Sequence, residues 1–222
     1  MRTLAIATLA AAVLVTAQGS LAADAGVPGK KLILLNKAVF GKLKTVYVSK
    51  SSADPGIAKG AAGDPTLLDG TFDWFYETDG ATSVFGCFLI EDSTPSFQGE
   101  WVKNTDTVAK FRNPDAKVCA GGCVKVAVIK PAKVAKVVAL GLGDFGGGGS
   151  FSEGAPTASD GVSTILTINN GNDSSTHRMC TKFATDSGST VILKEIAGGQ
   201  GQKLIGKNGV PVACPPSPCP TP

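Results

Sequence analysis

The sequence predicts an all-β protein: an antiparallel β-sandwich, or a partly open barrel, held by disulfides and preceded by an N-terminal signal peptide. Short runs rich in β-branched and aromatic residues are separated by turn residues, and the chain contains 28 Gly and 13 Pro. Such a composition favours many turns and few long helices. Short strands with frequent turns are typical of sandwiches and barrels.

Residues 1–22 have the pattern of a signal peptide. Arg2 precedes an apolar run from Leu4 to Val15, and Ser20-Leu21-Ala22 places small residues where a signal peptidase cuts. The run is too short for a bilayer, which needs about 20 apolar residues, so no transmembrane anchor is expected. We expect a mature chain beginning near Ala23 that is secreted, or resides in the periplasm or at the cell surface.

The mature chain is predicted to form a single β domain over residues 23–213. Its length fits one all-β domain. A subdomain boundary, if there is one, would fall in the polar break at 112–118. The Pro-rich tail at 214–222 is expected to be extended rather than packed.

The first half of the domain predicts two strands and a hairpin. Alternating apolar residues at 32–35 and 45–48 fit strands. Two Asp-Pro steps in 51–70 predict a long loop, because Pro removes a backbone donor. Aromatic and β-branched residues at 72–76 and 83–90 flank a turn made by Asp79 and Gly80, which predicts a hairpin.

The second half predicts a further series of strands. Val124, Val126 and Val128 alternate along 124–130, as the apolar face of a strand does. The Asn-Gly pair at 170–171 predicts a hairpin between 162–168 and 176–183. The remaining strands are expected, in chain order, to start at Trp101 and to lie at 134–140, 190–196, 203–205 and 209–213.

Six cysteines in an exported chain predict three disulfides, although six cysteines permit 15 pairings. The pairing we favour joins Cys119 to Cys123 across a short Ala-Gly-Gly spacer, Cys180 to Cys214, and Cys87 to Cys219. An alternative closes Cys214 on Cys219 across the intervening prolines.

No metal and no cofactor are expected. The Cys119 spacing is one residue too wide for CxxC, and the only histidine, His177, lies far from it in the sequence. The segment 141–146 matches GxGxxG, but glycines follow it where a nucleotide-binding fingerprint needs a helix to begin. It is interpreted as a loop.

Catalysis is not indicated by any motif, so no catalytic residue is assigned. His177 is the one imidazole available as a base, and the chain has no GxSxG elbow. A secreted hydrolase remains a second alternative function, using His177 or a pair of carboxylates. The candidate carboxylates are Asp69, Asp73, Glu77, Asp79, Glu91 and Asp92.

The aromatic residues offer a possible ligand surface. Trp74, Tyr76 and Trp101 are candidates for stacking on a sugar ring, which would make the chain a carbohydrate-binding module. The competing interpretation is that Trp74 and Tyr76 share the core face of a strand with Phe72, as alternation implies.

Landmarks along most of residues 30–215 resemble a family of uncharacterised cysteine-containing β modules in exported bacterial proteins. The resemblance implies one β module, supports a bridge between Cys180 and Cys214, and implies no activity. The segments that carry it are 49–50, 54–57, 64–66, 87–88, 129–130, 136–137, 179–183, 201–204 and 213–215.

The function expected from the sequence is that of a secreted, non-catalytic structural or interaction module at the cell surface or in the extracellular space. Protein, self or glycan are the expected partners. Self-assembly would use residues 26–35 as a strand added to a neighbour's sheet edge. Nucleic acid is not expected, because the net charge of +3 is small and the lysines are spread along the chain.

Overall fold

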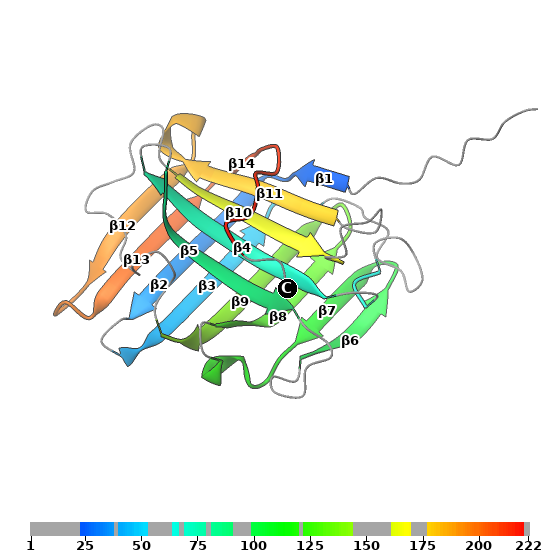
Figure 1. Cartoon of the computed structure of the whole chain (residues 1–222). Helices are drawn as coiled ribbons and strands as arrows, with labels where there is room; N and C mark the ends of the chain where they lie inside the picture. The colour runs from blue at the N-terminus through cyan, green and yellow to red at the C-terminus, as the bar shows by residue number, and fades with distance from the viewer. Residues whose placement is uncertain are drawn as a thin grey trace, which may run out of the picture.

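The protein is described by a computed structural model over residues 23–37, 40–52, 64–66, 69–78, 81–90, 99–119, 122–143, 161–169 and 177–219 (Figure 1). These residues form β-strands and short 3₁₀ turns, with no α-helix among them. No helix in this part of the chain is long and apolar enough to cross a membrane. The predicted signal peptide lies outside the described residues.

Fourteen strands follow one another along the described part of the chain, and they include the expected strands and both expected hairpins. Two 3₁₀ turns accompany them, η2 at Ala116–Val118 and η3 at Thr185–Ser187. The strands are β1 Ala23–Gly26, β2 Gly29–Lys37, β3 Lys42–Ser49, β4 Gly70–Thr78, β5 Ala81–Ile90, β6 Glu100–Thr105, β7 Val108–Arg112, β8 Cys123–Lys130, β9 Val134–Leu142, β10 Gly161–Ile168, β11 His177–Ala184, β12 Thr190–Ile196, β13 Gly201–Lys207 and β14 Val210–Pro211.

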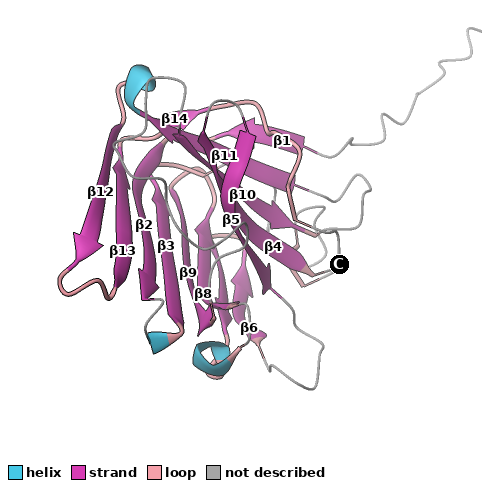
Figure 2. Ribbon diagram, turned by 60° about the vertical axis from the view of Figure 1, so that its left-hand side comes forward, coloured by secondary structure: helices cyan, strands magenta, loops and turns pink. Residues whose placement is uncertain are grey.

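The strands belong to one mixed sheet that curls into a half-barrel (Figure 2), which is closer to the expected partly open barrel than to a sandwich of two separate antiparallel sheets. Its main order is β1-β11-β10-β4-β5-β8-β9-β3-β2-β13-β12. Two pairs are parallel, β1 with β11 and β5 with β8. The β5–β8 pair, at Leu89 and Cys123, joins the two halves of the sheet, and hydrophobic alternation does not reveal such a link.

The segment at 112–118, where a subdomain boundary would fall, connects two strands that pair with each other. β7 and β8 are antiparallel neighbours, and η2 lies in the connection between them. The hairpin β6–β7 extends from β8 off the main path of the sheet.

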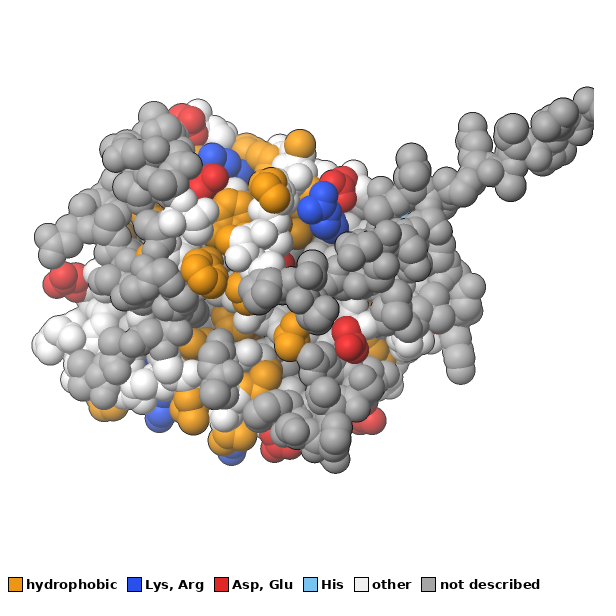
Figure 3. Space-filling view, in the orientation of Figure 1, with side chains coloured by type: hydrophobic (Ala, Val, Ile, Leu, Met, Phe, Trp, Pro, Cys, Tyr) orange, Lys and Arg blue, Asp and Glu red, His pale blue; other side chains and the backbone are white. Residues whose placement is uncertain are grey.

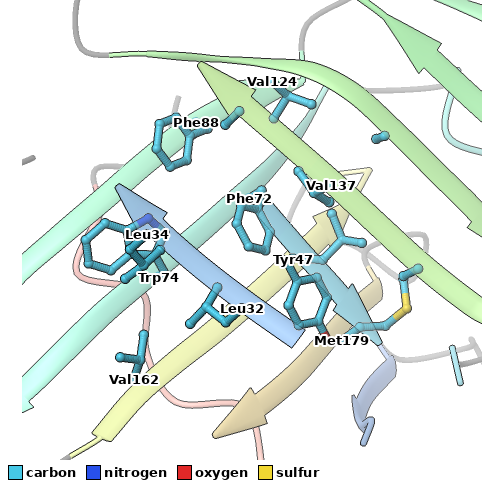
Figure 4. Close-up of a cluster of buried hydrophobic side chains, with 14 of the residues drawn as sticks. Leu32, Leu34, Tyr47, Phe72, Trp74, Phe88, Val124, Val137, Val162 and Met179 are labelled. Atoms are coloured by element: carbon cyan, nitrogen blue, oxygen red, sulfur yellow. The ribbon is translucent and has the colours of Figure 1, made fainter. Parts of the chain in front are cut away.

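The main core lies between the two halves of the curled sheet. Large side chains from both halves meet there, among them Leu32 and Leu34 from β2 and Phe72 and Trp74 from β4 (Figure 4). Burying one such side chain stabilises the fold by roughly 1.5–3 kcal/mol. The inner face of the sheet is therefore the main source of stability.

Two pairs of buried polar groups in the core are hydrogen-bonded. The Tyr47 hydroxyl lies 2.7 Å from Thr181 Oγ1, and Trp74 Nε1 donates to Thr45 Oγ1 at 3.1 Å. Burial raises the pKa of Tyr47 to about 12. Tyr47 also stacks on Phe72, with ring centroids 5.4 Å apart, so these polar groups fix how the two halves of the sheet pack.

A second, smaller apolar cluster lies on the outer face of the sheet. Phe75, Ile165 and Cys180 are buried there, from β4, β10 and β11. Val212 and Cys214 pack on them from the C-terminal segment. Every residue of β10 is consequently buried, on both faces of the sheet.

All three favoured disulfides are present: Cys87–Cys219, Cys119–Cys123 and Cys180–Cys214. The alternative bridge between Cys214 and Cys219 is therefore wrong. Three disulfides are typical of proteins in an oxidising compartment outside the cytoplasm.

Candidate functional site

The aromatic candidates do not form a surface. Trp74 and Tyr76 lie in the main core, 0% and 1% exposed, as strand alternation implied. Trp101 lies on β6, half-buried against Phe111 with ring centroids 5.6 Å apart. A platform for a sugar ring made of Trp74 and Tyr76 is ruled out by their burial.

His177 and the best-placed carboxylate lie on opposite faces of the sheet. His177 alternates with Met179 on the inner face and is buried, and this burial lowers its pKa. Asp73 shares the outer face with Phe75, beside Cys87. The two side chains cannot act on one substrate.

The other carboxylate candidates give no acid and base pair among the described residues. Glu77 forms an ion pair with Lys182 at 3.2 Å, and Asp69 is half-buried just before β4. Asp79, Glu91 and Asp92 lie outside the described residues.

The segment that matched GxGxxG begins as a strand rather than a loop. β9 continues through Gly141 to Leu142, and Gly143 follows with a φ of +99°. A Cβ at Gly141 would lie 2.2 Å from Gly122 Cα, so the absence of a side chain there serves backbone packing. Gly146 lies outside the described residues.

Asp73 is the one carboxyl among the described groups whose pKa is strongly shifted. It is 3% exposed on the outer face of β4, and desolvation raises its pKa from 3.8 to about 6. Its Oδ2 accepts hydrogen bonds from Ser217 Oγ at 2.9 Å and Thr71 Oγ1 at 3.2 Å. Its Oδ1 has no hydrogen-bond partner among the described residues.

Asp73 is covered by the C-terminal segment 212–219, which we call the strap. The strap crosses the outer face of the sheet in the order β11, β10, β4, β5. Disulfides join Cys214 to Cys180 on β11 and Cys219 to Cys87 on β5. Between them, Ser217 donates a hydrogen bond to Asp73 on β4. The tail is thus extended, as expected, but the expectation that it is not packed is wrong.

In the space-filling view, apolar side chains are visible at the surface on the strap side of the molecule (Figure 3). The strap covers part of an outer face that includes Phe75 and Ile165. Covering such a face removes apolar area from water, so the strap stabilises the sheet as well as closing over Asp73.

The remaining outer face, over β12, β13, β2, β3, β9 and β8, carries lysines instead. Inward residues alternate with outward ones along each of these strands, and the outward positions include nine Lys and no Asp or Glu. We call this surface the basic face. Its lysines are Lys31, Lys37, Lys42, Lys44, Lys130, Lys136, Lys194, Lys203 and Lys207.

Lysines on the basic face lie directly opposite one another in three cross-strand pairs. The pairs are Lys194 with Lys203, Lys207 with Lys31, and Lys37 with Lys42. Like charges directly opposite on neighbouring strands are destabilising. Lysines spread along the sequence are therefore gathered by the fold, which corrects the view that they do not cluster.

An apolar row runs through the middle of the basic face. Ile192, Ile205, Ile33, Val46 and Val138 are successive register partners across five neighbouring strands. Each is half-buried, with lysines on the flanking rows. The face thus combines positive charge with an apolar strip.

One end of the basic face carries exposed apolar side chains and a pocket. Phe40, Val118 and Leu142 are 51%, 53% and 42% exposed. A pocket of about 390 Å³ opens beside them, with Leu35 and Leu140 among its walls. Four lysines line it: Lys37, Lys42, Lys44 and Lys117.

The cluster of Asp73, Cys87 and Cys219 has metal-ligand spacing, with ligand atoms within 4.8 Å of one another. Both sulfurs are bonded to each other, so neither is a free thiolate that could ligate a metal.

Sequence reasoning overlooked both the strap and the basic face. The strap has no local signature, because its sequence is a run of Pro, Ser and Cys. The alternation of side chains along each strand could have revealed the basic face. In their strands, the lysines at 31 and 37, at 42 and 44, and at 203 and 207 lie on the face opposite to the buried leucines and tyrosine.

Comparison with protein-family models, with curated proteins and with solved structures finds no match for this chain. The resemblance in the sequence therefore gains no support from these comparisons.

Proposed function

We propose that this chain is an exported, non-catalytic interaction module that docks on an anionic lipid surface through its basic face. The observation that carries the proposal is the set of three directly opposed lysine pairs. A solvated face needs charge, but it does not need like charges placed opposite one another at a cost in stability. An anionic partner removes that repulsion.

The apolar end of the face favours a lipid surface over a soluble polyanion. Phe40, Val118 and Leu142 project beside lysines that line the pocket. Apolar side chains that enter the interface, with lysines around them at the level of the headgroups, are the pattern of peripheral membrane binding. A polyanion in solution would use the lysines alone.

The charges of the described chain support docking by this face. Its six strands carry Glu195 as their one acidic residue, and none of the nine lysines has an ion-pair partner among the described residues. The ion pairs that do form, Arg178 with Asp24 and Lys182 with Glu77, lie on the strap side. Positive charge is therefore concentrated on one side.

The test is co-sedimentation of the mature protein with vesicles of phosphatidylcholine, with and without phosphatidylglycerol. We expect binding that needs phosphatidylglycerol and weakens with salt. Replacing Lys42 and Lys44 by Gln should weaken it about 30-fold, since each lysine near such a surface is worth about 1 kcal/mol. Replacing Lys182 by Gln removes a positive charge on the strap side instead and should change binding little.

A Phe40→Ser variant separates insertion from charge alone. It should weaken vesicle binding without altering the salt dependence. Equal losses per charge removed in the Lys42/Lys44 and Lys182 variants would contradict the proposal. Binding to a soluble anionic polysaccharide, with none to anionic vesicles, would contradict it as well.

A further inference from the structure

We propose that the Cys87–Cys219 disulfide is a redox-active bond whose opening by an external dithiol is assisted by proton transfer from Asp73, and that this opening releases the strap. The inference concerns the opposite side of the molecule from the basic face and does not depend on lipid binding.

Accessibility distinguishes this disulfide from the other two. Cys87 and Cys219 are both partly exposed, whereas Cys119 and Cys180 are each 0% exposed. Thiol–disulfide exchange needs access to one sulfur and departure of the other. Cys123 and Cys214 are partly exposed as well, so each bridge has at least one partly exposed cysteine. Of the three bridges, only Cys87–Cys219 has both cysteines partly exposed.

A carboxyl group lies beside this bond. A carboxyl oxygen of Asp73 and the sulfurs of Cys87 and Cys219 lie within 4.8 Å of one another. Asp73 is the register partner of Cys87 across the β4–β5 pair, which places the carboxyl next to that sulfur. Its Oδ1 is buried and has no hydrogen-bond partner in the part of the chain that the structure describes, so this oxygen is available to exchange a proton.

The step balances as a two-electron reduction. A thiolate of the dithiol attacks Cys219 Sγ, the bond to Cys87 breaks, and the electron pair leaves on Cys87 Sγ. Asp73 gives its proton to that leaving sulfur. The second thiol of the dithiol then displaces Cys219, so the dithiol is oxidised to a disulfide and both cysteines are reduced.

The surroundings of Asp73 keep the carboxyl protonated at mildly acidic pH. Burial raises its pKa to about 6, and the hydrogen bonds from Ser217 and Thr71 lower it in part. The outer-face neighbours on adjoining strands are Ile165 on β10 and the disulfide on β5. Among the described residues, this face also carries two ion pairs, Glu77 with Lys182 and Asp24 with Arg178.

Reduction would free only one end of the strap. The Cys180–Cys214 bridge and the hydrogen bond from Arg178 Nη1 to Pro215 O hold the other end. Release of the Cys219 end would break the contact between Ser217 and Asp73 and uncover the outer face of β4. The result is a hinged flap controlled by one disulfide.

The experiment treats the oxidised mature protein with dithiothreitol from pH 5 to pH 8 and counts alkylated cysteines by peptide mass spectrometry. Rates are divided by the thiolate concentration at each pH. We expect Cys87 and Cys219 to be reduced first. At pH 5 the wild type should react roughly 100-fold faster than Asp73→Asn, the low end for general acid catalysis, and the advantage should fade by pH 8.

Two controls keep a structural effect apart from a chemical one. Cys180–Cys214, read in the same samples, should be reduced equally slowly in both proteins. Ser217→Ala keeps the carboxyl but removes a hydrogen bond that lowers its pKa, so the fall in rate should move to higher pH. Equal rates for Asp73→Asn and the wild type at every pH, or earlier reduction of Cys180–Cys214, would overturn the proposal.

Discussion

Asp73 makes the stability of the fold depend on pH in an unusual direction. Its pKa is about 6 in the folded protein and 3.8 for an ordinary Asp, so the folded state binds more protons in that interval. Its contribution is therefore fully present below about pH 4 and is lost as the pH rises through 6. A difference of roughly two pKa units corresponds to about 3 kcal/mol of unfolding free energy.

Replacing Asp73 with Asn should remove this dependence. The Asn oxygen still accepts the hydrogen bonds from Thr71 and Ser217, while its amide group lacks a partner, at a cost of about 1 kcal/mol. The variant should thus be more stable than the wild type by about 2 kcal/mol at pH 8, because the 3 kcal/mol term outweighs the 1 kcal/mol cost. At pH 4 it should be slightly less stable.

The assay is urea unfolding of the oxidised proteins at pH 4 to 8, followed by the fluorescence of the buried Trp74. His177 works in the opposite direction, because its lowered pKa makes the folded state less stable as the pH falls through 6.5. Subtracting the unfolding free energies of the wild type and Asp73→Asn at each pH cancels the contribution of His177. An Asp186→Asn variant, changed at an exposed position in η3, is the control. Parallel pH profiles for the wild type and Asp73→Asn would refute the reasoning.

Two further predictions concern the disulfides and a glycine. Replacing Cys87 and Cys219 by Ser opens a loop of 132 residues, and replacing Cys119 and Cys123 by Ser opens one of 4. The chain-entropy estimate gives losses of about 5 and about 2 kcal/mol, and urea unfolding that shows the reverse order would contradict it. Gly141→Ala should lower the melting temperature, since its Cβ would meet Gly122 backbone atoms at 2.2 and 2.6 Å and overpacking costs about 1–3 kcal/mol. An unchanged melting temperature would show that Gly141 is not needed for packing.

Strand positions were predictable because each strand has one face in the core. Alternation in β2 and β3 records which side chains are buried, and the turn pairs at 79–80 and 170–171 mark hairpins. The disulfide pairing was predictable only in part: the short spacer favoured Cys119–Cys123, whereas the other two bridges competed with a Cys214–Cys219 bridge and join segments far apart in the sequence. The strand positions and the short bridge depend on local sequence.

The parts that were not predictable depend on register between distant strands. Lys31 and Lys207 face each other only because β2 pairs with β13, and nothing near either residue indicates this. The burial of Asp73 likewise depends on a strap 144 residues further along the chain. Residues 26–35, expected to be available to a neighbour's sheet, instead include most of β2, which lies between β3 and β13.

The two outer faces of the sheet are linked through stability. Three opposed lysine pairs cost roughly 0.2–1 kcal/mol each, so the basic face lowers stability by about 2 kcal/mol in total. The strap acts in the other direction: the Cys87–Cys219 bridge alone is worth about 5 kcal/mol in the chain-entropy estimate. A closed strap therefore adds more unfolding free energy than the basic face removes. Opening the bridge would remove this surplus. The reduced protein should therefore be more stable on anionic vesicles than free in solution, because the headgroups relieve the lysine repulsion that remains after the bridge is lost.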